Sequence, residues 1–297
     1  MKKHICRNPV GVSKYTGLLL ILPFAVGAVL FILYPFVSSF ILGMTDYSGV
    51  GGAEFTGLRS YLDMLADSDL TQAAGVTVRY ALILVPLKLT VSLLVALLLS
   101  CEIRGIGVFR TVFYIPSILG ANLAVVIMWQ YLFKSSGLVN QFLGVFGISP
   151  VSWYGDSRFA MLMIVLLRLW EFGSTMVIFL TALNSIPREY YEAARVDGCG
   201  RVRAFFSITL PQLRSVIFIN LVLQTIAAFQ EFNAPFMLTD GGPLRGTYTL
   251  GMLIYQEMFR YSNVGYANAV SWALFAAIAA VVGLMFVLLR RKGEDER

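Results

Sequence analysis

Long apolar runs dominate the pattern of hydrophobic and polar positions along the chain. No charged residue occurs in residues 15–45, 111–133 or 261–289. A bilayer core about 30 Å thick is crossed by about 20 apolar residues in a helix. Each of these three runs therefore predicts one membrane-spanning helix.

Three further apolar runs are interrupted by one or two charges each. These runs are residues 77–100 with Arg79 and Lys88, residues 159–182 with Arg168 and Glu171, and residues 215–239 with Glu231. A buried helix of a soluble protein is the alternative for each run, but the three uncharged neighbours favour spans. We therefore expect an all-α polytopic membrane protein with six transmembrane helices.

The expected spans form one domain that covers residues 1–297. They lie at about residues 17–42, 77–100, 111–133, 159–182, 215–239 and 265–289. The first run is too long for a signal peptide, whose apolar core has about 7–15 residues, so we expect an uncleaved anchor. Residues 135–155 are uncharged but rich in turn formers, and predict an external loop with a short surface helix.

Composition supports the membrane interpretation. Apolar residues make up 58% of the chain and charged residues only 13%, which excludes a disordered protein and argues against an ordinary soluble enzyme. Fifteen of the 23 lysines and arginines fall in the two tails and in the loops after the second and fourth spans. By the positive-inside rule these segments are cytoplasmic, so both termini are expected inside and no nucleic-acid partner is needed.

Residues for catalysis are scarce. The only histidine is His4, and no phosphate-binding loop with its lysine occurs. The three cysteines, Cys6, Cys101 and Cys199, fall in or beside cytoplasmic segments and lack metal-site spacing, so we expect neither a disulfide nor a zinc site. The composition favours transport over catalysis, with no cofactor bound by this chain.

The longest cytoplasmic loop, residues 183–214, predicts a helix–turn–helix outside the membrane. Pro187 suits the first turn of one helix, and Gly198 and Gly200 can end it. Residues 201–209 are long enough for a second short helix, and Pro211 is then expected in the opening turn of the fifth span.

This loop resembles the EAA loop of ABC importer permeases at every defined position. The matching residues are Glu192-Ala193-Ala194, Gly198, Ile208 and Leu210-Pro211. In that family the loop forms coupling helices that dock into a cleft on an ATPase subunit. The resemblance therefore implies that the ATPase is contacted by Glu192, Ala193, Ala194 and Gly198, with basic support from Arg195, Arg201 and Arg203.

Three other segments resemble carbohydrate permeases, and the last of them is typical of the maltose-permease "F-type" partner. They are Phe55-Thr56-Gly57-Leu58-Arg59-Ser60-Tyr61, in which Ser60 replaces the usual Asn, Gly137-Leu138-Val139-Asn140, and Leu238-Thr239-Asp240-Gly241-Gly242-Pro243. The resemblance implies a type I ABC importer permease fold in a bacterial or archaeal cytoplasmic (inner) membrane. The implied partners are the lipid bilayer, a second related permease, two ATPase subunits that carry ATP and Mg, and an extracytoplasmic sugar-binding protein.

Polar residues within the spans are candidates for a substrate pathway. On a continuous helix Asn220, Gln224 and Glu231 would lie within about 40° of one another, with Phe232 nearby. Hydrogen bonding between helices is an equally weighted alternative.

Two other spans contribute weaker pathway candidates. Arg168 and Glu171 are spaced to pair within one helix, which favours a structural ion pair, although Glu171 stays a weaker pathway candidate. Trp272 is a similar candidate on the sixth span. Lys88 could contact a partner subunit, snorkel or pair.

Two alternative functions stay open at this point. One is a secondary transporter of a small polar solute, although no internal repeat relates residues 15–133 to residues 159–289. The other is an ABC permease for a substrate that is not a sugar. An intramembrane enzyme is disfavoured by the missing catalytic residues.

Overall fold

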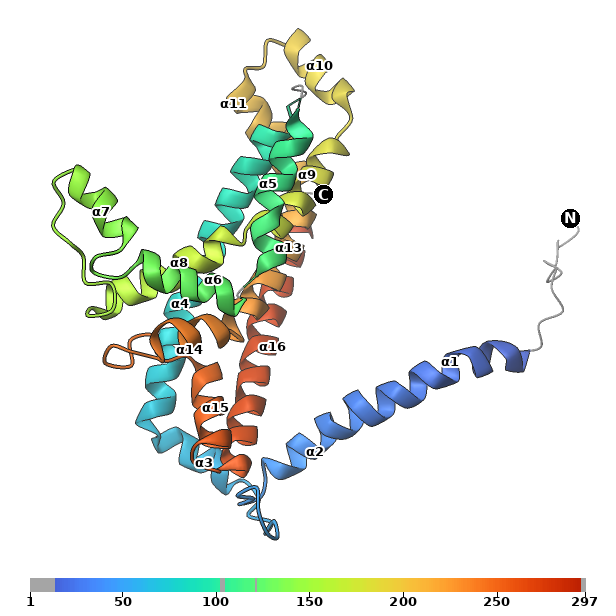
Figure 1. Ribbon diagram of the computed structural model, residues 1–297. Helices are drawn as coiled ribbons and strands as arrows, with labels where there is room; N and C mark the ends of the chain where they lie inside the picture. The colour runs from blue at the N-terminus through green and yellow to red at the C-terminus, as the bar shows by residue number, and fades with distance from the viewer. Residues whose placement is uncertain (1–13, 102–104, 121, 295–297) are drawn as a thin grey trace, which may run out of the picture. The chain divides into compact units, whose positions relative to one another are not determined.

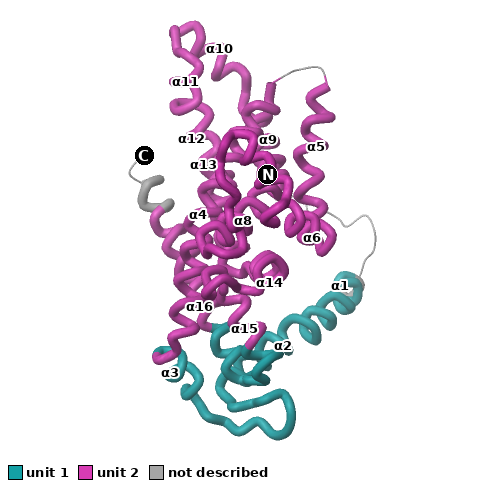
Figure 2. The backbone as a smooth tube through the Cα atoms, turned by 60° about the vertical axis from the view of Figure 1, so that its left-hand side comes forward, with its two compact units in different colours: residues 1–65, 257–272 teal, residues 66–256, 273–297 magenta. Residues whose placement is uncertain are grey.

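The computed structural model describes residues 14–101, 105–120 and 122–294 (Figure 1). In this part of the chain the regular structure is helical, apart from one isolated β-bridge between Thr45 and Phe55. The chain divides into two compact units (Figure 2): residues 1–65 with 257–272, and residues 66–256 with 273–297. The predictions that concern His4 and Cys6 lie outside the described residues.

The first unit contains the first predicted span. Helix α1 (Lys14–Ala28) continues through a π-helical segment, η1 (Val29–Leu33), into α2 (Tyr34–Leu42), and α3 (Arg59–Ala66) follows. Leu19–Leu42 is long and apolar enough to cross a membrane, and none of its most apolar window is buried within the protein. An apolar helix without cover needs lipid or another subunit around it.

The second unit is organised around one long helix, α4 (Ser68–Leu99). It packs against α8 (Ser157–Trp170), α9 (Gly173–Asn184) and α13 (Arg214–Phe229). The side chain of Asp67 accepts a hydrogen bond from the Asp69 amide (2.8 Å) and caps α4, so the helix begins nine residues before the predicted start of the second span. Tyr80 and Ala96 of α4 are fully buried in this core.

Three predicted spans are broken rather than straight. Helix α5 (Ile106–Leu119) meets α6 (Leu123–Leu132) at 102°, α8 meets α9 at 45°, and residues 201–212 meet α13 at 66°. The fifth predicted span, residues 215–239, is wrong as one helix, because α13 ends at Phe229 and α14 (Asn233–Thr239) begins after a break. Among the described residues, Leu19–Leu42, Ser68–Leu99 and Val264–Leu288 are unbroken candidate spans, and counting each bent pair as one span gives up to six.

Two sequence motifs build compact turns in the second unit. Asn140, in α7 (Leu138–Val145), accepts hydrogen bonds from the Val151 amide (3.1 Å) and Trp153 Nε1 (3.0 Å). Between α14 and α15 (Leu250–Phe259), the hydroxyls of Thr239 and Thr247 share a hydrogen bond (2.7 Å). Helix α7 confirms the short helix that the sequence predicts within residues 135–155.

The sixth span is the long helix α16 (Val264–Glu294). Its residues 264–272 belong to the first unit and its later turns to the second. Within the second unit, Phe286 packs edge-on against Phe218 of α13, with ring centroids 4.8 Å apart. This helix covers residues 265–289, the predicted sixth span, and its residues 264–288 are long and apolar enough to cross a membrane.

We predict that close packing at Gly173 limits what this position accepts. A Cβ there would overlap the carbonyl oxygen of Phe113 and lie 2.8 Å from the Tyr114 Cα. Gly173→Ala should therefore destabilise the fold by about 1–3 kcal/mol. The measured result should be a lower unfolding temperature of the detergent-solubilised protein. Gly75→Ala is the matched control, because a Cβ at Gly75 meets nothing within 4 Å. Equal unfolding temperatures for the two variants would contradict this packing.

Candidate functional site

A partly buried arginine joins two buried carboxylates beside the helix breaks. Arg168, in the last turn of α8, donates from Nε and Nη2 to the two carboxylate oxygens of Glu231, each at 2.7 Å. Its Nη1 lies 3.0–3.1 Å from the oxygens of Glu171. The Arg168–Glu171 pair predicted from the sequence is confirmed. The fork-shaped contact with Glu231 is the stronger geometry, because two parallel charge-assisted hydrogen bonds fix the planes of both groups.

Glu231 occupies the break between α13 and α14. Its Oε1 accepts a hydrogen bond from the Ala234 amide (3.1 Å) in the first turn of α14. The hydroxyl of Tyr80, from α4, lies 3.5 Å from Oε2. The Glu231 main-chain carbonyl accepts from the Thr249 hydroxyl at 2.8 Å. These contacts satisfy polar groups at an interrupted helix that would otherwise be exposed to an apolar surrounding.

The predicted polar stripe on the fifth span is wrong in its geometry. Glu231 lies beyond the end of α13, so its angular position does not follow from the helix that carries Asn220 and Gln224. Asn220 Nδ2 donates to the Val216 carbonyl (2.9 Å), and Gln224 Nε2 donates to the Thr175 hydroxyl (3.0 Å). The contact from Gln224 joins α13 to α9. It is therefore a hydrogen bond between helices, the alternative to a substrate-pathway role for this residue.

A partly open cavity of about 480 Å³ lies between the broken helices and α4. Its polar and aromatic lining residues are Lys88, Arg168, Glu171, Gln224, Gln230, Glu231, Phe232 and Asn233. Four of the six predicted pathway residues therefore lie together, and Asn220 and Trp272 are not among the lining residues. A cavity of this size with a few convergent polar groups is suited to a small polar ligand.

Trp272 instead packs within the first unit. Its ring centroid lies 4.7 Å from that of Phe36 and 4.8 Å from that of Phe40, both on α2. Its Nε1 donates to the Ser39 hydroxyl at 3.2 Å. These contacts give Trp272 a packing role where the first helix meets the start of α16.

Three aromatic rings lie next to the break. Phe232 stacks on Phe236, and Tyr255 contacts both, with all three centroid distances at 5.0 Å. Phe232 is itself a lining residue, so the cavity has an aromatic side as well as a charged one.

Sequence reasoning missed Gln230 and Asn233 as lining residues. Both are exposed at the break, which hydrophobicity alone does not reveal. A usable signal was Pro235, because proline in an apolar run favours the first turn of a new helix. The sequence shows Lys88 as a charge deep within the second span, but it does not predict that Lys88 lines the same cavity as Glu171 and Glu231.

The loop of residues 183–214 forms the predicted helix–turn–helix at one end of the second unit (Figure 1). Its first helix, α10 (Arg188–Val196), follows Pro187 at the N-cap. Gly198 then adopts a left-handed conformation with φ +73°, as expected for a residue that ends a helix. The second arm runs through α11 (Arg201–Ala204), η2 (Phe205–Thr209) and α12 (Leu210–Gln212).

A hydrogen bond of 2.8 Å between the hydroxyls of Tyr191 and Thr209 joins the two arms. Pro211 lies in α12, before the 66° bend into α13. Its predicted position in the opening turn of the fifth span is therefore wrong, because the chain turns between α12 and α13.

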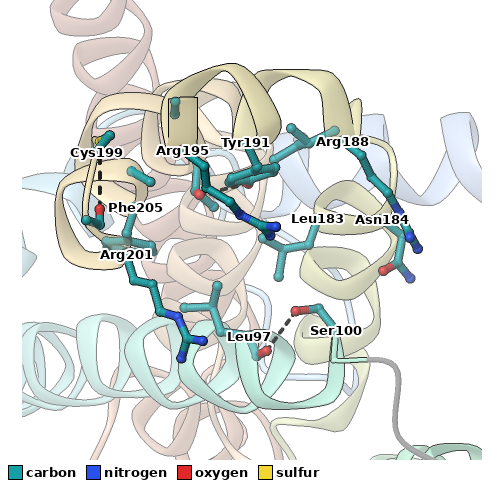
Figure 3. Close-up of a pocket in the computed structure, with 15 residues that line it drawn as sticks. Leu97, Ser100, Leu183, Asn184, Arg188, Tyr191, Arg195, Cys199, Arg201 and Phe205 are labelled. Carbon is teal, nitrogen blue, oxygen red and sulfur yellow. Dashed lines mark hydrogen bonds between the residues drawn. The ribbon is translucent and has the colours of Figure 1, made fainter. Parts of the chain in front are cut away.

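A second cavity, of about 840 Å³, lies between this loop and the ends of α4 and α9. Figure 3 shows the side chains of Arg195 and Arg201 extending into this cavity, which is also lined by Leu97 of α4 and by Ser100, the residue that follows α4. In the described part of the chain neither arginine forms an ion pair. Of the other predicted coupling residues, Glu192, Ala193 and Arg203 are exposed and Ala194 lines the cavity.

Comparison with known proteins places the chain in a family. Residues 107–291 match the family described as "Binding-protein-dependent transport system inner membrane component". The "Probable ABC transporter permease protein YesP" of Bacillus subtilis is 38% identical over 92% of this chain and 90% of its own length. The "Trehalose/maltose transport system permease protein MalF" of Thermococcus litoralis is 32% identical over 88% and 89%.

A solved structure shares the fold. One chain of a bacterial alginate ABC transporter, crystallised with an alginate pentasaccharide-bound periplasmic protein, superposes with a TM-score of 0.81. The match covers 93% of this chain and 94% of that one, at 19% identity. The chain belongs to the family of inner membrane components of binding-protein-dependent transport systems, and it has the type I ABC importer permease fold.

We predict that Arg168 is needed to hold the break together. In Arg168→Gln, Glu171 and Glu231 would be left buried without their cation, at a cost of about 3–5 kcal/mol. The unfolding temperature in detergent should fall clearly below that of the native protein. Arg158→Gln, an exposed position on the same helix, should leave it unchanged. Identical unfolding temperatures for both variants would show that the ion pairs add nothing to stability.

Proposed function

We propose that the chain is the translocation subunit of an ATP-driven carbohydrate importer, with ATP hydrolysis on a separate partner. The observation that carries this proposal is the two-armed loop, residues 183–214, whose sequence matches the EAA loop and whose arms are joined by the Tyr191–Thr209 hydrogen bond. The chain itself acts as a passive permease rather than an enzyme.

Two helices connect the loop with the polar cavity. Helix α9 begins two residues after Glu171 and ends at Asn184, next to the first arm of the loop. Helix α13 begins after the second arm and ends one residue before Gln230, beside Glu231. Movement of the loop by an ATPase would therefore be transmitted along both helices to the two carboxylates held by Arg168.

The ATPase would recognise the exposed side of the loop. Glu192 and Ala193 are exposed on α10, and small side chains allow another backbone to approach closely. Arg195, Arg201 and Arg203 supply positive charge, which can orient an acidic partner surface. ATP and Mg would be bound by that partner.

Other partners follow from the same proposal. They are a second related permease, two ATPase subunits and an extracytoplasmic sugar-binding protein. The uncovered apolar surface of α1 and α2 is suited to lipid or to the second permease. A carbohydrate is favoured as cargo because the cavity combines amide groups with the ring of Phe232, which itself stacks on Phe236. The named trehalose/maltose relative supports the same class.

We further propose that both termini and the loop are cytoplasmic, as the distribution of lysine and arginine predicts. Reporter fusions after Gly105 and Gly200 should give a cytoplasmic signal. Fusions after Asp67 and Gly155 should give an external one. An external signal at Gly200 would exclude contact between the loop and a cytoplasmic ATPase.

The left-handed turn at Gly198 gives the sharpest test of coupling. A β-branched residue is strained at φ +73°, at a cost of about 1–3 kcal/mol. Gly198→Thr should therefore displace the loop and reduce ATP-driven sugar uptake at least several-fold in proteoliposomes. Gly200 is the matched control, because it is an N-cap with φ −70°, where threonine is accepted as well as glycine.

The assay would measure uptake, sugar-stimulated ATP hydrolysis and co-purification of the ATPase with each variant. Normal stimulated hydrolysis in Gly198→Thr would contradict a coupling role for the loop. Uptake by the native chain that follows an ion gradient without any ATPase would instead identify a secondary transporter.

A further inference from the structure

Lys88 differs from the other charged residues at the cavity. Its side chain comes from the middle of α4, is 9% exposed and lines the cavity at the helix breaks. Arg168 contacts two carboxylates directly. Within the part of the chain that the structure describes, the Lys88 ammonium forms no hydrogen bond or ion pair. A buried ammonium has three donors, and leaving them without acceptors is costly.

The carboxylates nearby are already engaged. Both oxygens of Glu231 and both oxygens of Glu171 accept hydrogen bonds from Arg168. These three residues together carry one net negative charge, which balances the charge of Lys88, although none of them forms an ion pair with it. The cavity therefore has a cation with free donors, and each of its carboxylate oxygens already has a partner.

This arrangement favours one kind of ligand. A neutral sugar binds well where free carboxylates accept its hydroxyl protons, and here those acceptors are occupied by a guanidinium. A carboxylate on the ligand would instead supply the acceptors that the Lys88 ammonium lacks, and charge-assisted hydrogen bonds are about twice as strong as neutral ones. The exposed amides of Gln230 and Asn233 can contact the remaining hydroxyls.

We propose that this cavity takes an acidic saccharide, a sugar unit bearing a carboxylate, and that Lys88 binds that carboxylate. The inference rests on the proposed carbohydrate transport and specifies its substrate class. The cavity volume of about 480 Å³ falls within the usual range for small-molecule sites, roughly 300–1,000 Å³. Phe232, another lining residue, supplies an apolar face for the sugar ring.

The test uses the assembled transporter, including its binding protein, in proteoliposomes. The probes are di- and trisaccharides of glucose, galactose and mannose, each paired with the counterpart in which one hydroxymethyl group is a carboxylate. Uptake and stimulated ATP hydrolysis are measured for each pair. The uronate member of at least one pair should be transported better than its neutral counterpart.

Variants of Lys88 then distinguish binding of the ligand carboxylate from mere balancing of the charges of Arg168, Glu171 and Glu231. Lys88→Gln should lower uronate uptake by about tenfold or more, and neutral uptake much less, because one charged hydrogen-bonding contact is lost. Lys88→Arg should keep most uronate uptake. Arg79→Gln, at an exposed position on the same helix, should change neither. The binding protein is identical throughout, so these differences report on the permease.

Three results would overturn the inference. Transport of neutral saccharides alone would contradict it while leaving the proposed function intact. Equal loss of neutral and uronate uptake in Lys88→Gln would show that Lys88 only balances charge. If no saccharide of either kind stimulates ATP hydrolysis, both the inference and the proposed function fail. If Lys88→Gln does not assemble, the native transporter and Lys88→Arg are compared instead. Preference of both for the uronate member of a pair would support the inference, and preference of neither would overturn it.

Discussion

The guanidinium of Arg168 sets a constraint on which much of the second unit depends. Two buried carboxylates are stable only while their cation stays in place, and here Glu171 and Glu231 come from two different helix breaks. The carboxylate of Glu231 also accepts from the first turn of α14 and contacts Tyr80 of α4. One side chain thereby fixes the ends of α8, α13 and α14 around the long central helix. The breaks expose polar groups, and the cavity forms where those groups meet.

The same helices that end at these ion pairs support the loop at their other ends. Helix α9 leads from Glu171 to the first arm, and α13 leads from the second arm to Glu231. In the proposed mechanism, a displacement of the loop moves the ends of α9 and α13 and thereby the two carboxylates beside them. This connection relates the proposed contact with an ATPase to the proposed site of the cargo, and it needs no catalytic residue in the chain itself.

The sequence was sufficient for the apolar runs, the helical class and the turn at Gly198, because each depends on local composition or on one residue type. It was not sufficient for the breaks, since hydropathy measures how apolar a run is and not whether its helix bends. The error at Glu231 has this origin: an angle was assigned along a helix that ends at Phe229. The Arg168–Glu171 pair is local and was predicted. The contact between Arg168 and Glu231 joins residues 63 positions apart, and only the packing of α8 against the break brings them together.

The most direct test of this account is a double-mutant cycle on Arg168 and Glu231, using Arg168→Met, Glu231→Leu and the combined variant. Unfolding free energies would be measured in detergent for all four proteins. If the fork-shaped ion pair holds the break, each single variant should be strongly destabilised. The combined variant should then recover stability, with a coupling free energy of about 1.5 kcal/mol or more. Additive effects, with a coupling free energy near zero, would show that the two side chains do not depend on one another and would contradict the account.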